Sequence, residues 1–542
     1  MDTTNNALIT TGIVVLSALC YFFYKGYKAR LPFRILSAQG VPMPPWNPFL
    51  GHLLSLPPVL KLFPEDAQQI FAFGELSKQF TKSDGLFYLD MWPFSDPLLV
   101  ISSPSQCIQA CQQHDLPKPR VMKDFFHPFA GGENLFTMNG PEWKRSRALF
   151  NPGFAANYIL EQMPHIVEEA LVYVDVLREH AKKGDVFSLD DATLWFTMDI
   201  IGAVTLNSRL NSQRTYNPLA SAMRSQVHWH CMDGELNPFV RWNPVRPVIE
   251  WWNGKTMDRY ISKELDKRFA ERQSAKGQAS RSVIDLALES YIADNPSLAA
   301  AKTMDKAFKS WAITQIRLFL FAGHDSTSST IVYCYYLLSK NPEALARIQA
   351  EHDAVFGRDI SAVPDLLIKQ PQLANKLPYT LAVIKEALRL FPPASGIRGG
   401  LPGADLTDSH GNSYPTEGMT IWILHTAVQR HAGHWKDPDA FIPDRWLVTD
   451  PEDPYYPVKG AWRPFEFGPR NCVGQTLVML DIKAVLAMTV REFDISDAYQ
   501  EWDSLNLRKG QKDIGGERAY QISSGGAHPS DGFPCRVRER KL

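Results

Sequence analysis

The chain has 542 residues, of which 45% are hydrophobic and 21% are charged, as in an ordinary globular enzyme with a large core. A formal net charge of -1 without a basic stripe argues against a nucleic-acid-binding protein. The seven cysteines are odd in number and widely spread, so we expect reduced thiols and no disulfide framework.

The N-terminal segment is apolar and carries no charge from residue 3 to residue 24. A span of roughly 20 apolar residues is enough to cross a bilayer. Lys25, Lys28 and Arg30 follow it, so the positive-inside rule places the rest of the chain in the cytosol. A cleaved signal peptide is the alternative, but its basic n-region and small-residue cleavage site are missing. We expect residues 1–30 to form a single transmembrane anchor.

The remainder of the chain divides into a short connection and one large domain. Four prolines between Gly40 and Leu53 disfavour helix, so residues 31–55 are predicted to be a stiff hinge. Residues 56–542 are expected to be one domain, mainly α with small β-sheets. Helical periodicity extends to about residue 390. The region beyond it is rich in Gly and Pro, with strand-like pieces such as TIWILHTAV and CRVRER.

The stretch from Phe239 to Trp252 is aromatic and interrupted by proline. One interpretation is an ordinary packed loop. The other is a surface that dips into lipid or borders a substrate entrance, because tryptophan suits a membrane interface. The sequence leaves both open.

A motif near the C-terminus carries the clearest chemistry. Phe465, Gly468, Arg470, Cys472 and Gly474 fit the pattern F-x-x-G-x-R-x-C-x-G. Gly468 permits a tight turn, and Gly474 allows the following helix to lie close to a flat ligand. Cys472 precedes that helix, whose amide dipoles favour a thiolate, and Arg470 is placed to meet an anion. A planar, anionic ligand whose metal is bound by one thiolate is haem with its propionates. We therefore expect haem b with Cys472 as its axial iron ligand; a free core cysteine is the alternative.

With this motif the chain resembles the cytochrome P-450 family of haem-thiolate monooxygenases, in its microsomal, membrane-anchored form and most like fungal secondary-metabolism members. A long central helix of that family carries A/G-G-x-D/E-T-T/S. The run FLFAGHDSTSST places Ala322, Gly323, Asp325, Ser326 and Thr327 in the matching positions. The resemblance implies that the acid and a hydroxyl relay protons to dioxygen. Ser326 stands where the family more often has threonine, so the main relay is Ser326 or Thr327.

Other matching motifs imply a cradle around the haem. Glu386 and Arg389 form E-x-x-R, and Arg445 matches the arginine of P-x-R; the resemblance makes these three a buried structural triad that holds the cysteine loop. Trp143 and the arginine four residues later match W-x-x-x-R. In the family such residues contact the haem propionates, and further propionate partners are common near the start of the strand region. The implied propionate partners here are Trp143, Arg147 and Arg398.

The resemblance implies an activity and its partners. The family inserts one oxygen atom from O2 into an organic substrate and releases the second as water. Electrons would come from NADPH through a separate partner, NADPH–cytochrome P-450 reductase. Lys144 and Arg145 are candidates for attracting its acidic flavin domain. The implied location is the endoplasmic reticulum membrane, with one pass through the lipid bilayer and the catalytic domain in the cytosol.

The substrate is less well defined. Family members line the pocket with the segment before W-x-x-x-R, part of the central helix and a C-terminal turn. The residues concerned here are Phe125, Phe126, Phe129, Phe136, Phe321 and Gly525. These phenylalanines suggest a hydrophobic, aromatic or polycyclic small molecule, such as a polyketide or terpenoid, although they could equally pack the core. Two alternative functions are a haem-thiolate isomerase or dehydratase that needs no O2, and a non-catalytic haem-binding sensor.

Overall fold

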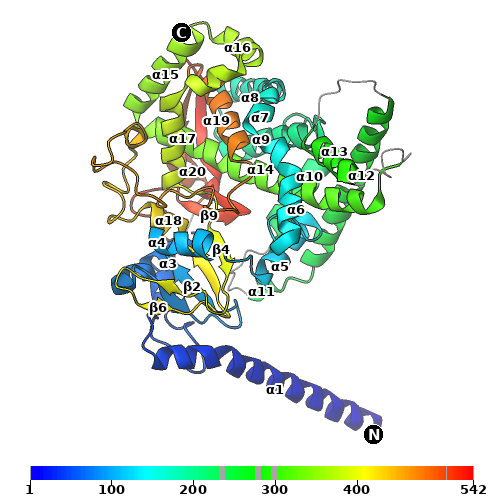
Figure 1. The fold of residues 1–542 in the computed structure, drawn as a ribbon, viewed down its shortest axis with the longest axis vertical. Coiled ribbons are helices and arrows are strands. Elements are labelled where there is room, and N and C mark those ends of the chain that lie inside the picture. Colours follow the sequence, from blue (N-terminus) through cyan, green and yellow to red (C-terminus); the bar gives the residue numbers. More distant parts are fainter. Residues whose placement is uncertain (1, 231–237, 275–281, 295–302, 508–509, 541–542) are drawn as a thin grey trace.

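The computed structural model describes residues 2–230, 238–274, 282–294, 303–507 and 510–540. The fold is rich in helices and has small sheets, which confirms the predicted fold class. Helices gather around the central helix α14 (Lys306–Lys340) in the upper part of the molecule, and a strand-rich part lies below them (Figure 1). Helix α1 projects from the base (Figure 1).

The helices fall on either side of the start of α14 in the chain. The first group is α1 (Asp2–Ala38), α2 (Pro57–Leu60), α3 (Gln69–Ser77), α4 (Pro104–Ile108), α5 (Arg120–Ala130), α6 (Gly140–Phe150), α7 (Ala156–Glu161), α8 (Met163–Lys183), α9 (Leu189–Leu206), α10 (Pro218–Trp229), α11 (Pro238–Arg241), α12 (Arg246–Ser274) and α13 (Val283–Asp294). The second group is α14 (Lys306–Lys340), α15 (Pro342–Phe356), α16 (Val363–Lys369), α17 (Pro378–Leu390), α18 (His425–Gln429), α19 (Gln475–Thr489) and α20 (Tyr499–Leu505).

The strands form small sheets. They are β1 (Phe87–Leu89), β2 (Leu98–Ile101), β3 (Phe187–Ser188), β4 (Gly396–Gly399), β5 (Leu406–Thr407), β6 (Ser413–Tyr414), β7 (Thr420–Ile423), β8 (Phe493–Asp497), β9 (Gln521–Ser524), β10 (Gly526–Pro529) and β11 (Pro534–Glu539). The largest sheet has the order β1-β2-β7-β4, with β2 and β7 parallel and the other pairs antiparallel. Strand β11 lies between β3 and β8, and β9 and β10 form a hairpin.

Both strand-like pieces of the sequence contain strands. CRVRER lies in β11, and TIWI forms β7. Leu424 precedes the short helix α18, which contains the last four residues of TIWILHTAV. Leu424 donates its N–H to the carbonyl of Ile101, and its own carbonyl accepts the N–H of Val428 in the first helical turn.

Helix α14 is the centre of the core. Asp305 caps its N-terminus, because its side chain accepts the N–H of Phe308, and the helix ends at Lys340 ahead of Pro342. It packs closely along α9. At Gly323 a Cβ would lie 2.7 Å from Cγ1 of Ile201 on α9, so only glycine allows these helices to approach so closely.

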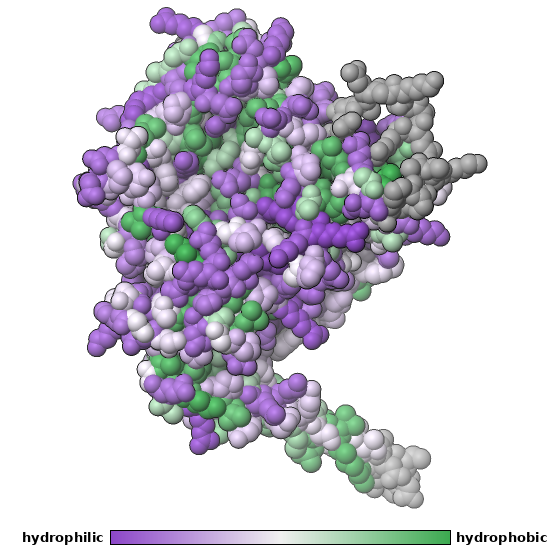
Figure 2. Space-filling model, viewed as in Figure 1, coloured by the Kyte–Doolittle hydropathy of each residue, from purple (hydrophilic) through white to green (hydrophobic). Residues whose placement is uncertain are grey.

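Helix α1 continues past residue 30, the end predicted for the anchor, through Pro32 to Ala38. Residues 9–38 are long and apolar enough to cross a membrane, and most are exposed. In Figure 2 the projecting helix shows green and pale side chains with little purple, whereas purple is common on the body. Its second half contacts the body, since Phe33 is buried and the Phe22 and Trp92 rings lie 4.6 Å apart.

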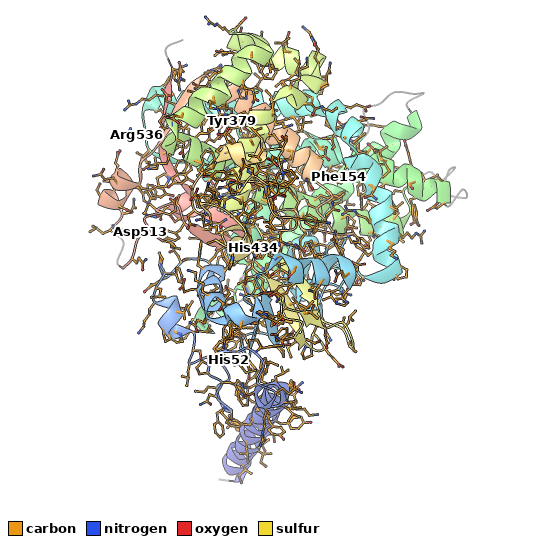
Figure 3. The ribbon with its side chains drawn as sticks, turned by 60° about the vertical axis from the view of Figure 1, so that its left-hand side comes forward. His52, Phe154, Tyr379, His434, Asp513 and Arg536 are labelled. Atoms are coloured by element: carbon orange, nitrogen blue, oxygen red, sulfur yellow. The ribbon has the colours of Figure 1, made fainter. Side chains whose placement is uncertain are left out.

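The segment predicted to be a hinge is held against the body at one residue, Asp90. Trp46 donates its indole N–H to Asp90 at 3.0 Å, and the N–H of Asp90 donates to Nδ1 of His52 at 2.7 Å. His52 is fully buried near the base of the molecule, just above α1 (Figure 3). The proline-rich segment is therefore packed where it meets the body.

The described cysteines are all free thiols, as expected for reduced cysteines; Cys231 lies outside the described residues.

Candidate haem site

A cavity of about 1930 Å³ lies between α14 and the cysteine loop, defined here as residues 464–474. Most of the site residues predicted from the sequence line it: Trp143, Arg147, Asp325, Ser326, Thr327, Phe465, Arg470, Cys472 and Gly474. Gly468, Arg398 and the three residues of the predicted triad are not among its lining. Segments nearly 330 residues apart in the chain thus share one cavity.

The cysteine loop has the tight geometry expected of its glycines. Gly468 has a φ of +82°, and a Cβ there would collide with the carbonyl of Cys111. The N–H of Cys472 donates to the carbonyl of Phe465 at 2.9 Å, which closes the loop. Helix α19 starts directly after Gly474, where a Cβ would lie 3.9 Å from Sγ of Cys472.

The Cys472 thiol opens into the cavity although it lies deep in the protein. Burial raises the pKa of this thiol, whereas the N–H groups of Gly474 and Gln475 and the guanidinium of Arg147 act to lower it. The expected effect of the helix N-terminus is therefore present, but burial outweighs it. A metal ion bound to such a thiol removes the proton outright.

Cationic side chains gather at the same cavity. Arg147 donates to the carbonyl and the side chain of Asn471 at 2.9 and 3.1 Å. Arg470 donates to the carbonyl of Met138 at 2.7 Å, and burial lowers the pKa of Arg470 to about 10. Lys118 is also buried, and burial lowers its pKa well below the usual range. Burying these positive charges is unfavourable. An anionic ligand beside them would offset this unfavourable free energy, so the site fits haem with its two propionates.

Lys118 was not identified from the sequence. It lies between two helices, its Nζ donates to the carbonyl of Ile397 at 3.2 Å, and it sits 4.1 Å from the centre of the Phe136 ring. A single lysine in a loop carries no motif, so only the fold shows that it reaches this cavity.

Arg398, expected to contact a propionate, is fully buried and pairs with Glu466 at 2.6 Å. Glu466 also binds Arg463 and His425, each at 2.9 Å. Burial alone would raise the pKa of Glu466, but Arg398, His425 and Arg463 hold it well below its usual range. Glu466 has a φ of +60°, which turns its side chain inward within the cysteine loop. This carboxylate follows Phe465 directly in the motif, and the sequence interpretation overlooked it.

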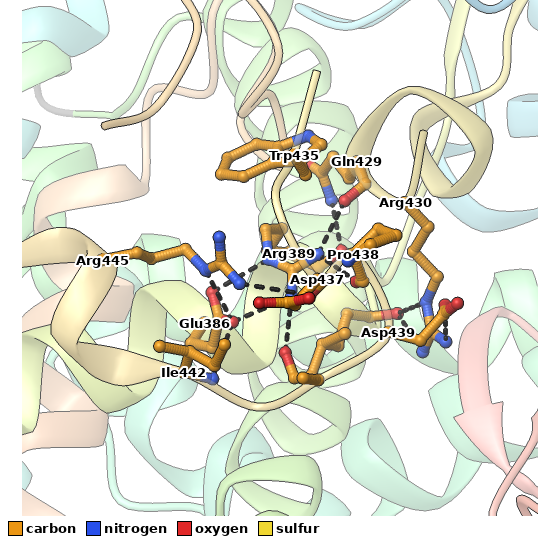
Figure 4. A network of polar contacts seen from close by, with 12 residues as sticks. Glu386, Arg389, Gln429, Arg430, Trp435, Asp437, Pro438, Asp439, Ile442 and Arg445 are labelled. Carbon is orange, nitrogen blue, oxygen red and sulfur yellow. Dashed lines mark hydrogen bonds and ion pairs between the residues drawn. The ribbon is translucent and has the colours of Figure 1, made fainter. Parts of the chain in front are cut away.

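The predicted triad forms in the structure, as Figure 4 shows. Glu386 binds Arg389 at 2.8 Å and Arg445 at 3.0 Å, and all three side chains are buried. Gln429 links them to the cysteine loop, because its carbonyl accepts from Arg389 and its Oε1 accepts the N–H of Arg463 at 2.8 Å. Arg463 in turn binds Glu466.

The hydroxyls of α14 differ in their surroundings. Ser326 donates to the carbonyl of Ala322 at 2.8 Å and is partly open to the cavity. Oγ1 of Thr327 is buried and has no hydrogen-bond partner within the described part of the chain. The carboxylate of Asp325 accepts the N–H of Gly526 at 2.6 Å.

The aromatic residues divide between the cavity and the core. Phe125, Phe126, Phe136 and Phe321 line the cavity, and Gly525 does so from the β9–β10 hairpin. Phe129 does not line it; it is fully buried and stacks on Phe321 with ring centres 4.1 Å apart. Both interpretations of the phenylalanines therefore hold, for different members of the group.

Comparison with known proteins agrees with this geometry. The cytochrome P-450 family model matches residues 41–511. Cytochrome P-450 monooxygenase polC of Polytolypa hystricis is 42% identical over 96% of this chain and 93% of its own length. Cytochrome P-450 monooxygenase acrF of Aspergillus aculeatus is 34% identical over 84% of this chain and 94% of its own.

Among solved structures, the haem domain of cytochrome P-450DA has the same fold, with a TM-score of 0.69, 21% identity and coverage of 92% of this chain and 98% of that one. With the cysteine loop and the long central helix in one cavity, the chain belongs to the cytochrome P-450 family and is a monooxygenase of that family.

Proposed function

We propose that this protein inserts one oxygen atom from O2 into a large hydrophobic substrate, using electrons that a separate NADPH–cytochrome P-450 reductase takes from NADPH. One observation carries the proposal: the Cys472 thiol opens into the same cavity as Asp325 and Ser326 of α14. A thiolate ligand and a proton-relay pair in one cavity are what oxygen activation at a haem requires.

The residues would divide the work as follows. Cys472 would bind the iron of haem b, while Lys118, Arg147 and Arg470 would neutralise its propionates. Thiolate-bound haem supplies the O2 activation itself. The Glu466 cluster and the Glu386 triad would hold the cysteine loop in place, with Arg398 acting through Glu466.

We assign the proton-relay hydroxyl to Ser326. Its Oγ is open to the cavity and is held by only one helix carbonyl, so it can rotate to donate and accept. Thr327 also borders the cavity, but it is almost fully buried, and its branched side chain has less rotational freedom. Asp325 beside them would exchange protons with the hydroxyl.

The substrate class follows from the lining of the cavity. Phe125, Phe126, Phe136 and Phe321 surround space that is larger than a typical ligand pocket of roughly 300–1,000 Å³. Part of that space would hold the haem. A polycyclic compound such as a fungal polyketide or terpenoid would fit the remainder, and the relatives named above come from fungi.

A second set of exposed apolar side chains supports attachment to a lipid bilayer beside α1. Its exposed members are Phe239, Val240, Trp242, Val245, Val248, Trp251 and Trp252. Arg241 donates to the carbonyl of Phe94 at 2.7 Å, and Phe94 follows the loop on which α1 packs, so the two surfaces are joined. We propose the endoplasmic reticulum membrane, with the catalytic domain in the cytosol.

Helix α6 is the proposed reductase-docking element. Lys144 and Arg145 on it are exposed, while Arg147 on the same helix binds the cysteine loop. Positive charge at this position would attract an acidic flavin domain toward the haem side that Cys472 occupies.

The test is reconstitution of the full-length protein with reductase and candidate polycyclic substrates. We expect an oxygenated product only when NADPH, reductase and O2 are all present. A rearranged product that forms without them would identify an isomerase or dehydratase, and substrate binding without any product would identify a sensor. Either result would contradict the proposal.

A further inference from the structure

A buried histidine lies between two carboxylates beside the proposed relay. His528 on β10 has Nδ1 at 2.8 Å from Asp190, in the first turn of α9, and Nε2 at 3.3 Å from Asp325 on α14. All three side chains are buried. The sequence interpretation gave no role to His528 or Asp190, which lie 338 residues apart.

The β9–β10 hairpin is shaped around the Asp325 carboxylate. Gly525 has a φ of +87°, and a Cβ at Gly525 would collide with Oδ1 of Asp325. At Gly526 a Cβ would lie 2.6 Å from Oδ2, the atom that the Gly526 N–H binds. Because Gly525 and Gly526 have no side chains, the hairpin backbone can contact the Asp325 carboxylate closely. Asp325 also lines the cavity.

Helix α14 is fastened both to the hairpin and to α9 beside this contact. Ser329 donates to the carbonyl of Ala527 in the hairpin, and Ser328 donates to Asp190 on α9 at 3.3 Å. The imidazole of His528 is thus fixed between elements that cannot slide past each other without breaking buried hydrogen bonds.

Charge explains why the histidine is stable there. Burial alone would lower the pKa of His528, but the carboxylates of Asp190 and Asp325 raise it to about 10. Among the described residues, His324 interacts with Asp325 and His528, Tyr173 and Tyr333 interact with Asp190, and Arg224 interacts with His324. Burial lowers the pKa of His324 to about 4, so His324 is neutral at physiological pH. The positively charged imidazolium of His528 therefore interacts favourably with the carboxylates of both Asp190 and Asp325.

We propose that His528 is a positioning residue for Asp325: its imidazolium, anchored on the far side by Asp190, sets how the Asp325 carboxylate turns between the hairpin and the cavity. This inference rests on the proposed function, in which Asp325 exchanges protons with Ser326. Without the imidazolium, Asp325 would lose its charged partner and would keep the N–H of Gly526 as a neutral one.

The first readout is the coupling of NADPH consumption to product formation. It is measured with the full-length protein, loaded with haem and reconstituted with reductase. In His528→Gln we expect product per NADPH consumed to fall about tenfold, with more hydrogen peroxide released, because the relay acid is mispositioned. The spectral shift on substrate binding should keep its amplitude, because His528 does not line the cavity.

The second readout is thermal unfolding as a function of pH, which needs no turnover. The pKa of His528 is raised from 6.5 to about 10 on folding, so its stabilising contribution is full below pH 6.5 and is lost as pH rises toward 10. This single group raises the unfolding constant by up to about tenfold per pH unit in that window. His528→Gln should remove this part of the slope.

The matched control is His352→Gln. His352 on α15 is equally buried and binds the hydroxyl of Thr380 at 2.8 Å, but burial lowers its pKa to about 3. This variant should lower stability evenly above pH 6.5 and leave coupling unchanged.

Asp190→Asn provides a second variant should His528→Gln not fold, since it keeps both His528 and Asp325. In Asp190→Asn we expect the pH dependence of unfolding and the product formed per NADPH to lie between those of the wild-type protein and of His528→Gln. If both variants form as much product per NADPH as the wild-type protein, the proposal is overturned, whatever the pH dependence of their unfolding. A wild-type protein that forms no product under full redox supply would instead overturn the proposed function.

Discussion

At the scale of single residues, this protein buries charged side chains together with charged partners. A buried charge without such a partner would strongly destabilise the fold. Glu386 is fully buried and accepts from Arg389, Arg445, Ile442 and Trp446. Its carboxylate is thus the shared partner of two buried guanidinium groups, and it is joined to the cysteine loop through Gln429.

Replacing Glu386 with Gln should therefore destabilise the protein by about 3–5 kcal/mol, because two buried arginines lose their counter-charge. Urea unfolding and haem retention would measure this loss. The matched control is Asp444→Asn, which removes the exposed Arg347–Asp444 pair at 2.6 Å and should change stability by about 0–1 kcal/mol. Equal effects of the two variants would show that the triad has no special structural role.

The assignment of the relay hydroxyl gives a second prediction. Ser326→Ala should lower product per NADPH by about 10–100-fold, because it removes the hydroxyl that is open to the cavity. Thr327→Val, which keeps the shape of a buried side chain, should have a much smaller effect. Product and hydrogen peroxide yields would decide between them, and the reverse ranking would assign the relay to Thr327.

Sequence reasoning at the scale of residues depends on local motifs. Cys472, Arg470 and Phe465 of F-x-x-G-x-R-x-C-x-G stand close together in the sequence, and all three line the cavity. Lys118 and His528 could not be found in this way, because their neighbours come from distant parts of the chain. Contacts of that kind depend on tertiary packing, which local spacing does not encode.

At the scale of elements, helix α19 carries the cysteine loop at its start and an unusual carboxyl further along. Asp481 is buried and lines the cavity, and its Oδ1 has no hydrogen-bond partner among the described residues. Burial raises the pKa of this carboxyl well above its usual range. Because the folded state then binds the proton more tightly, the carboxyl lowers stability as pH rises above 3.8, its ordinary pKa.

Asp481→Asn should therefore stabilise the protein by about 1–3 kcal/mol at pH values above neutrality, since the amide needs no proton. It should also flatten the fall in Tm with rising pH. Asp365→Asn on α16 is the control, because its carboxylate is exposed and binds Lys369. If Asp481→Asn unfolds at a lower Tm at high pH, the charged carboxylate stabilises the helix after all.

Element boundaries followed the sequence only in part. Helix α17 starts at Pro378 and ends two residues before Pro392, in agreement with the places that proline favours at helix ends. At the N-terminus, by contrast, helix α1 passes through Pro32, where packing of Phe33 and Leu36 into the body stabilises helix beyond the predicted end. Helix α18 begins inside a segment that the sequence predicted to be a strand. The chain turns there into the helix, where His425 binds Glu466.

At the scale of the whole molecule, the chain forms a body with a large internal cavity and an apolar helix extending from its base (Figure 1). The fold class followed from periodicity and from the resemblance. The arrangement of the cationic residues around the cavity did not, because it depends on how α6, the cysteine loop and β4 come together.

Charge reversal on α6 tests the proposed docking side. Lys144→Glu with Arg145→Glu should raise the KM for reductase about tenfold and weaken its dependence on ionic strength, because steering by exposed charges is screened by salt. Turnover measured across salt concentrations gives the result. Reversal of the exposed Lys182 and Lys183, at the end of α8, is the control. Equal effects would place the reductase elsewhere or make its docking non-specific.

The central claim is that Cys472 binds haem iron, and one spectrum tests it most directly. The purified protein, reduced and exposed to carbon monoxide, should give the difference spectrum of a thiolate-ligated haem, and Cys472→Ala should lose that band. The free Cys111, also buried near Glu466, gives a matched control in Cys111→Ala, which should keep the band. A protein that binds no haem, or a Cys472→Ala variant with an unchanged spectrum, would contradict the account.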